Sequence, residues 1–227
     1  MTDKNTLAHT FISKDELQLI LNKNFSHTVP NRFYYLGNKS CLRQPIVGII
    51  GSRHPTAYGR EQAFRFAKEL SQAGCSILSG GAIGIDTIAN ETAHNQKGFS
   101  IAVIGSGIEH LYPSSNSFLF EKMKNSGHGL ILSEFEPREP PLRWNFPKRN
   151  HSIALLCDFV LVIEAAKTSG SLITANAALD LGVDVGAVPG TVDSPNSEGT
   201  NALIQNGAFC IQTARDVLDR VSSLLTR

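Results

Sequence analysis

The sequence predicts an α/β protein with an extended Rossmann-like, doubly wound, mostly parallel sheet and helices on both faces. Short continuous apolar runs, such as Ile46–Ile50, recur along the chain, as expected of strands buried on both faces. Segments with apolar residues at helical spacing alternate with these runs, which indicates parallel βαβ units. Five predicted helices end in a glycine just before a strand: Gly74, Gly98, Gly127, Gly182 and Gly207.

The elements follow in order along two parts of the chain. Residues 1–42 are expected to form an N-terminal extension with a short helix and a strand, and residues 43–227 the Rossmann-like domain. The predicted strands are Arg32–Gly37, Ile46–Ile50, Cys75–Leu78, Ile101–Ile104, Leu130–Leu132, Phe159–Ile163, Val185–Val188 and Ala208–Ile211. The predicted helices are Lys14–Asn22, Glu61–Gln72, segments ending near Gly98, Gly127 and Gly182, Gly199–Gln205 and Ala214–Leu225.

Composition excludes several classes of protein. The 227 residues carry 21 Lys+Arg and 20 Asp+Glu, so a nucleic-acid site must be a local patch. No stretch approaches the about 18 uninterrupted apolar residues of a membrane helix, and the acidic N-terminus lacks the apolar core of a secretory signal. The four cysteines form no CxxC pair, which disfavours zinc or a disulfide scaffold and favours a reducing cytoplasm.

Three loops rich in glycine and serine follow predicted strands. They are Gly51-Ser52-Arg53, the run from Ser79-Gly80-Gly81 to Gly84, and Lys167-Thr-Ser169-Gly170-Ser171. Because the carboxyl ends of parallel strands share one edge of the sheet, these loops predict a common anion site at helix N-termini. Ordinary turn chemistry is the alternative. None of the loops reads GxGxxG, and no acidic residue follows at the ribose position, which disfavours a dinucleotide oxidoreductase.

Glu136–Asn150 is predicted to be a long, proline-rich loop, and such loops are often functional. Its cations are interleaved with Trp144 and Phe146, a pattern that suits single-stranded nucleic acid, with cations on phosphates and rings on bases. Alternatively, the aromatic residues, Trp144 above all, fold inward as core anchors. The cations are Arg138, Arg143, Lys148 and Arg149.

No catalytic signature is recognisable. The sequence lacks GxSxG, HExxH, GxxxxGK[ST] and paired carboxylates at a plausible catalytic spacing. We therefore expect a binding protein and not an enzyme, with no catalytic residues, no metal and no cofactor.

The motifs together resemble the DprA/Smf family of DNA-processing proteins. The similarity runs from about residue 30 to about residue 220. The segments that carry it are Tyr34–Asn38, Val47–Arg53, Ser79–Asp86, Tyr112-Pro113, Ser133-Glu134, Phe146–Asn150, Ser169–Ala175, Val188–Gly190 and Gly199–Ala208.

This resemblance implies a sequence-independent single-stranded DNA-binding protein that forms a homodimer. Such proteins protect incoming strands in natural transformation and help to load the recombinase RecA. Family DNA-binding positions correspond to Arg53, Arg143 and Phe146, with Lys148, Arg149 and Asn150 nearby. The loops would add backbone and hydroxyl contacts from Gly51, Ser52, Ser79, Gly80, Gly81, Lys167, Ser169, Gly170 and Ser171.

Two departures from the family are visible. His151 stands where the family often has a basic residue, and no winged-helix domain is expected within residues 43–227. Three other functions stay open: a nucleotide-binding enzyme similar to phosphoribohydrolases, a mononucleotide sensor, and a structural interaction module. The first is disfavoured because no glutamate follows the loop at Ser169–Ala175.

Overall fold

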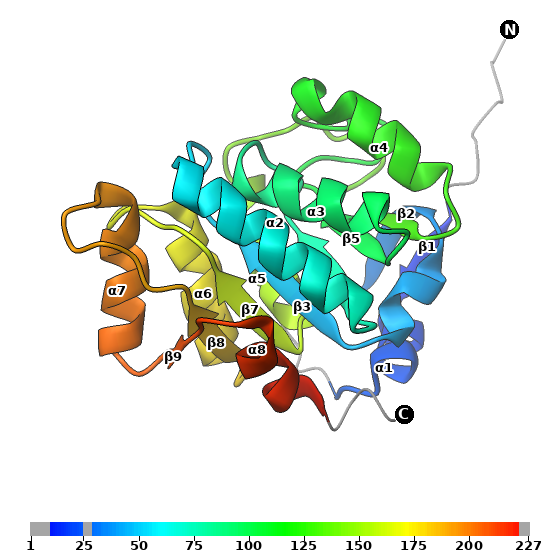
Figure 1. The fold of residues 1–227 in the computed structure, drawn as a ribbon. Coiled ribbons are helices and arrows are strands. Elements are labelled where there is room, and N and C mark those ends of the chain that lie inside the picture. The colour runs from blue at the N-terminus through cyan, green and yellow to red at the C-terminus, as the bar shows by residue number, and fades with distance from the viewer. Residues whose placement is uncertain (1–9, 25–28, 223–227) are drawn as a thin grey trace, which may run out of the picture.

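The computed structural model describes residues 10–24 and 29–222. They form one nine-stranded sheet between two layers of helices (Figure 1). The strands are β1 (Phe11–Ser13), β2 (Arg32–Gly37), β3 (Ile46–Ile50), β4 (Ser76–Ser79), β5 (Ser100–Val103), β6 (Gly129–Ser133), β7 (Phe159–Val162), β8 (Asp184–Ala187) and β9 (Phe209–Cys210). The helices are α1 (Lys14–Leu21), α2 (Ala57–Gln72), α3 (Ile85–Asn95), α4 (Ser117–Lys124), α5 (Asn145–Leu156), α6 (Gly170–Asp180), α7 (Glu198–Gln205) and α8 (Ala214–Val221).

The strand order is β1-β2-β6-β5-β4-β3-β7-β8-β9, and β3 through β9 run parallel. The chain proceeds from β3 outward in one direction to β4 and later returns to place β7 on the other side of β3. This reversal is a topological switch point, and ligands of open α/β sheets bind beside such a point at the carboxyl ends of the strands. The predicted doubly wound, mostly parallel sheet is confirmed.

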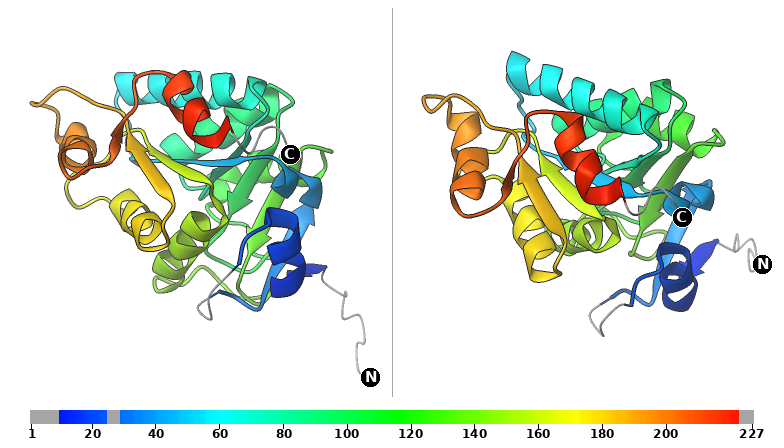
Figure 2. Two further views of the ribbon diagram at one scale, coloured as in Figure 1. Left: turned by 90° about the horizontal axis from the view of Figure 1, so that it is seen from below. Right: turned by 60° about the horizontal axis from the view of Figure 1, so that its bottom comes forward.

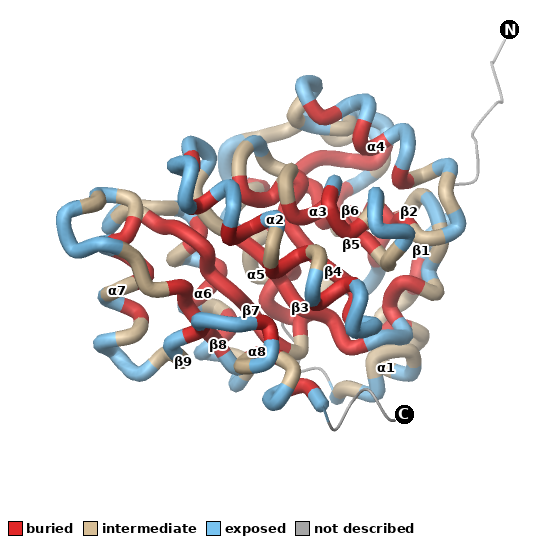
Figure 3. The backbone as a smooth tube through the Cα atoms, viewed as in Figure 1, coloured by how far each residue is buried: buried red, intermediate tan, exposed pale blue. Residues whose placement is uncertain are grey.

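Helices cover both faces of the sheet (Figure 2). Helices α1, α5, α6 and α7 pack on one face, against side chains such as Ile46 and Val160, whereas α2, α3 and α8 pack on the other, against Val47 and Leu161. The central strands are buried along their whole length, as Figure 3 shows. This burial on both sides explains why these strands read as continuous apolar runs.

The first strands continue the sheet with antiparallel pairing. β1 pairs with β2, and β2 pairs with the edge of the parallel part at β6. Leu17 of α1 lies in the same buried cluster as Ile46. Lys23 lies 2.9 Å from the Asp158 carboxylate and donates to the Cys157 carbonyl oxygen at 2.7 Å, so the N-terminal part is tied to the start of β7.

Several details differ from the sequence prediction: strand β1 was not predicted, and helix α2 begins at Ala57 and not at Glu61. The segment predicted as a loop up to Asn150 becomes helix α5 at Asn145, and Pro147 is tolerated because it lies in the first turn, where backbone N–H groups have no helical partner. The left-handed residue after α3 is Lys97 (φ 59°) and not Gly98, although Gly74, Gly182 and Gly207 do adopt positive φ. Residues after 222, where the last helix was predicted to continue to Leu225, lie outside the described part of the chain.

None of the described helices is long and apolar enough to cross a membrane.

Leu17→Ala should lower the free energy of unfolding by about 2–5 kcal/mol, because it empties a fully buried position. Leu19 of the same helix is 83% exposed, so Leu19→Ala is the matched control and should change stability by less than about 0.5 kcal/mol. Urea denaturation of both variants measures the difference. Equal losses would contradict the packing of α1 against the sheet.

Candidate functional site

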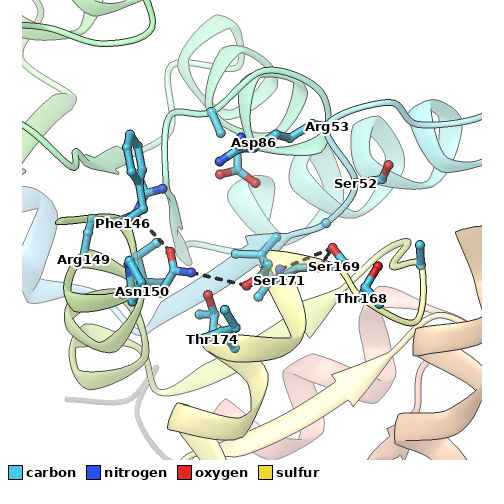
Figure 4. Close-up of a pocket in the computed structure, with 18 residues that line it drawn as sticks. Ser52, Arg53, Asp86, Phe146, Arg149, Asn150, Thr168, Ser169, Ser171 and Thr174 are labelled. Carbon is cyan, nitrogen blue, oxygen red and sulfur yellow. Dashed lines mark hydrogen bonds between the residues drawn. The ribbon is translucent and has the colours of Figure 1, made fainter. Parts of the chain in front are cut away.

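A cavity of about 410 Å³ lies at the switch point, where β3 and β7 end side by side. Four segments that are distant in the sequence line it: the loop after β3, the residues around the start of α3, the loop between β7 and α6, and the first turns of α5 (Figure 4). The sheet topology therefore brings residues of all three predicted anion loops, including Ala82 of the loop from Ser79 to Gly84, and the aromatic-cationic segment into one pocket, called here the switch-point pocket.

The loop after β3 is held close to the start of α3. A side chain at Gly51 would meet the Glu164 carbonyl oxygen at 2.9 Å, and one at Gly84 would meet the Ser52 carbonyl oxygen at 2.4 Å. The Ser52 carbonyl instead accepts a hydrogen bond from the N–H of Ile85 at 3.1 Å. Glycine is required at both positions so that these backbones can approach one another.

Arg53 is the free cation of the switch-point pocket. Its side chain is exposed, and no described residue accepts a hydrogen bond from it or forms an ion pair with it. The backbone N–H groups of Ser52 and Arg53 likewise have no acceptor among the described residues. A planar guanidinium beside unused N–H donors is suited to bind phosphate oxygens.

The opposite wall of the pocket is the N-terminus of α6. Ser169 caps this helix: its hydroxyl accepts from the Ser171 N–H at 3.3 Å and lies 2.7 Å from the Ser171 hydroxyl. The amide of Asn150 donates to the Gly170 carbonyl at 3.3 Å, which links α5 to α6 (Figure 4). The helix thus presents its positive end and two hydroxyls to the pocket.

Arg149 forms part of the pocket floor and is only 5% exposed. Its Nη1 donates to the carbonyl oxygens of Gly80 and, at 2.8 Å, Val103, and its Nε donates to the Asn150 side chain at 3.1 Å. Burial lowers the pKa of Arg149 to about 10, so it stays charged at neutral pH. It joins the ends of β4 and β5 to α5 and adds positive potential beneath the ligand position.

Asp86 is the one carboxylate among the residues that line this pocket. It accepts a hydrogen bond from the Gly80 N–H at 3.1 Å. Burial raises the pKa of Asp86, and the charge of Arg149 offsets part of this rise. With two arginines against one acid, the pocket favours an anion.

The aromatic residue of the pocket is Phe146. Its ring lies on the backbone of Gly105, where a side chain would come within 3.0 Å of the ring, and meets Tyr112 edge to face at 6.0 Å between centroids. Trp144, by contrast, is 63% exposed. The alternative that Trp144 is a core anchor is therefore wrong: it immediately precedes α5 and points away from the core.

The structure brings together most of the predicted site residues but not all of them. The predicted residues that line the switch-point pocket are Gly51, Ser52, Arg53, Phe146, Arg149, Asn150, Ser169, Gly170 and Ser171. Gly80 lines a smaller adjoining cavity, whereas Ser79 is buried and donates to the Ile49 carbonyl at 2.6 Å. Gly81 is also buried, and Arg143, Lys148 and Lys167 are exposed outside the pocket lining.

Sequence reasoning did not place Thr168 or Thr174 in the pocket, nor Tyr112 beside it. Thr168 lies within a loop that was singled out, and Tyr112 within a motif of the family resemblance, so both signals were present. Thr174 also lies within a motif of the resemblance, Ser169–Ala175, but its approach to the pocket depends on the docking of α6.

A Rossmann-like protein with an arginine-lined anion pocket at the switch point is the class that this geometry defines. The family model for DNA recombination-mediator protein A matches residues 11–222. The chain belongs to this family, which confirms the resemblance to DprA/Smf proteins.

Known proteins of this family are similar to the chain in sequence and in structure. DNA processing protein DprA from Bacillus subtilis (strain 168) is 41% identical over 175 residues, which are 77% of this chain and 58% of that protein. The X-ray structure of DprA from Streptococcus pneumoniae superposes with a TM-score of 0.86 at 37% identity, covering 94% of this chain and 74% of that chain.

DNA processing protein A from Helicobacter pylori, a structure described for its single-stranded DNA binding mode, superposes with a TM-score of 0.78 at 30% identity. The match covers 88% of this chain and 94% of that chain. The present chain thus spans nearly all of this solved structure, but little more than half the length of the Bacillus relative.

Arg149→Ala should lower the free energy of unfolding by about 2–5 kcal/mol, because it leaves the buried Gly80 and Val103 carbonyls without a donor and Asp86 without its neighbouring positive charge. Lys148→Ala removes the same charge from the exposed side of α5 and should be nearly neutral. Thermal unfolding of the Arg149→Ala and Lys148→Ala variants measures this difference in stability. Equal stability of the two variants would show that Arg149 does not hold the strand ends together.

Proposed function

We propose that this protein binds single-stranded DNA without sequence preference through the switch-point pocket. In this role it protects incoming strands and helps to load RecA during natural transformation, acting in the cytoplasm as a homodimer. It acts by binding and not by catalysis. The observation that carries the proposal is the guanidinium of Arg53, which has no partner among the described residues and shares one pocket with the N-terminus of α6 and with Phe146.

The pocket offers the two kinds of contact that a single strand needs. Arg53, the unused backbone N–H groups and the α6 N-terminus suit phosphate oxygens. The Phe146 ring offers an apolar face to a base, and stacking on such a ring tolerates any sequence. The structure of the Helicobacter pylori relative is described for its single-stranded DNA binding mode, and this supports the same class of ligand here.

The carboxylates at this edge of the sheet argue for binding rather than hydrolysis. Asp86, the single lining carboxylate, already accepts from Gly80 N–H. Glu164, which lines a neighbouring cavity, accepts from both the N–H and the hydroxyl of Thr56, at 3.0 and 2.5 Å. Both acids are thus engaged in holding loops and helix N-termini, and the start of α6 supplies no glutamate of the kind found in phosphoribohydrolases.

RecA loading and dimerisation rest on membership of the family. Sedimentation of the purified chain tests dimerisation, and displacement of a single-stranded DNA-binding protein by RecA, with and without the chain, tests loading. Release of free base from nucleoside monophosphates would contradict the proposal that the protein is not an enzyme.

Arg53→Ala should weaken binding of labelled oligo-dT by roughly ten-fold or more and flatten its salt dependence by about 0.7 in log–log slope, because one phosphate contact is lost. Arg43→Ala is the matched control: it removes one exposed cation just before β3, at the other end of that strand. Fluorescence anisotropy over a salt series gives both values. If the two variants have equal affinities and salt slopes, or if the unmodified protein does not bind oligo-dT, the pocket is not the DNA-binding site.

Asp86→Asn should bind oligo-dT a few-fold more tightly at neutral pH, because it removes a negative charge and keeps an acceptor for the Gly80 N–H. Burial raises the pKa of Asp86. As pH falls toward this raised pKa, protonation of Asp86 should therefore strengthen binding by the unmodified protein. The variant should lack this component of the pH dependence, and parallel titrations at several pH values measure it. If the affinity for oligo-dT depends on pH in the same way for the two proteins, the charge of Asp86 does not influence binding.

A further inference from the structure

The loop that carries Arg53 is bound at both of its ends to one buried residue, Glu164. This loop comprises residues 51–56, between β3 and α2, and is called here the Arg53 loop. Glu164 lies just after β7 and is 2% exposed. Its backbone lies against Gly51 at the start of the loop, where a side chain would come within 2.9 Å of the Glu164 carbonyl oxygen. Its carboxylate accepts from the N–H and the hydroxyl of Thr56 at the end of the loop, at 3.0 and 2.5 Å.

The first turn of α2 leaves room for this carboxylate. A side chain at Gly59 would come within 2.2 Å of a Glu164 carboxylate oxygen, and the Gly59 N–H donates to the Thr56 hydroxyl at 3.1 Å. Among the described residues, no cation forms an ion pair with Glu164. A buried carboxylate without a cation costs stability unless hydrogen bonds satisfy it. The Thr56 bonds are the ones that satisfy Glu164, and they fix the end of the Arg53 loop.

A further contact holds the middle of the Arg53 loop. The His54 carbonyl accepts from the Asn196 side chain at 2.9 Å. The Asn196 carbonyl in turn accepts from the N–H of Ala165, the residue after Glu164, at 2.8 Å. The loop is therefore tied along its length to the residues that follow β7. The Arg53 side chain, by contrast, is exposed and has no partner among the residues that the structure describes.

We propose that Glu164 is a positioning residue for DNA binding, whose carboxylate holds the Arg53 loop in the shape that presents the Arg53 guanidinium to a phosphate. This proposal rests on the proposed function and names the residue that sets the geometry of its principal cation. Glu164 acts through Arg53 and does not itself contact the strand. A loop that is already ordered before binding saves the entropy that ordering it on the ligand would cost.

The charge of Glu164 makes a positioning role distinguishable from a simple electrostatic one. By Coulomb's law alone, removal of a carboxylate near an anion site strengthens anion binding. Glu164→Gln keeps the size of the side chain and an oxygen for the Thr56 N–H, but its amide nitrogen cannot accept the proton of the Thr56 hydroxyl. If the carboxylate positions the loop, this variant should bind oligo-dT more weakly although the protein has lost a negative charge.

The test is a double-mutant cycle between Glu164→Gln and Arg53→Ala. Fluorescence anisotropy with labelled oligo-dT, over a salt series, gives the affinity and the salt slope of the unmodified protein, the two single variants and the double variant. Glu164→Gln alone should weaken binding roughly three- to ten-fold, the range for one lost hydrogen bond. In the Arg53→Ala background it should weaken binding by less than about two-fold and leave the salt slope unchanged, because the guanidinium that it positions is gone.

Three further variants serve as controls. Thr56→Val removes the hydroxyl partner without changing any charge and should weaken binding as Glu164→Gln does, whereas Thr56→Ser keeps the hydroxyl and should restore most of that affinity. Asp158→Asn is the matched control, because this carboxylate accepts from the Ile46 N–H at 2.8 Å at the opposite ends of β3 and β7. It should lower stability and leave the affinity for oligo-dT unchanged. Thermal unfolding of every variant confirms that it is folded at the temperature of the titrations.

The outcomes separate this proposal from the proposed function. Tighter binding by Glu164→Gln would show that the carboxylate acts through its charge and would overturn the positioning role. Equal weakening by Glu164→Gln with and without the Arg53 side chain would overturn it as well. If Arg53→Ala loses affinity while Glu164→Gln and Thr56→Val bind normally, the positioning role fails and the proposed function stands. If the unmodified protein does not bind oligo-dT, the proposed function itself fails.

Discussion

The buried guanidinium of Arg149 is the interaction on which the functional edge of this protein depends. It comes from α5, yet its hydrogen bonds are to the carbonyls at the ends of β4 and β5. Without such a donor, those carbonyls would be buried and unsatisfied where a parallel sheet ends. Arg149 therefore fixes where the first turn of α5 lies over the sheet. That position in turn sets the places of Phe146 on Gly105 and Asn150 on Gly170.

The two arginines of the switch-point pocket thus have different tasks. Arg149 has its Nη1 and Nε donors engaged by the fold and contributes charge from a fixed place, whereas Arg53 has no partner among the residues that the structure describes. Asp86 limits the net charge of the floor and holds the Gly80 N–H. This division gives a site with a positive potential fixed by the fold and one exposed cation at its rim. A preorganised field of this kind avoids the cost of reorganising charges during binding.

The sequence by itself determined the fold class, most of the strands and the three loops, because burial on both faces and positive-φ turns leave local marks in the residue pattern. It also marked Glu136–Asn150 as functional, but tertiary structure decided the form of that segment. Helix α5 begins at Asn145 although Pro147 and a run of cations obscure its periodicity, since its stability comes from packing on the sheet and from the Arg149 hydrogen bonds. Likewise, no local signal distinguishes Arg149, which is buried, from Lys148, which is exposed. Which of two neighbouring cations faces the core depends on how α5 docks, and this is a property of the folded chain and not of its sequence pattern.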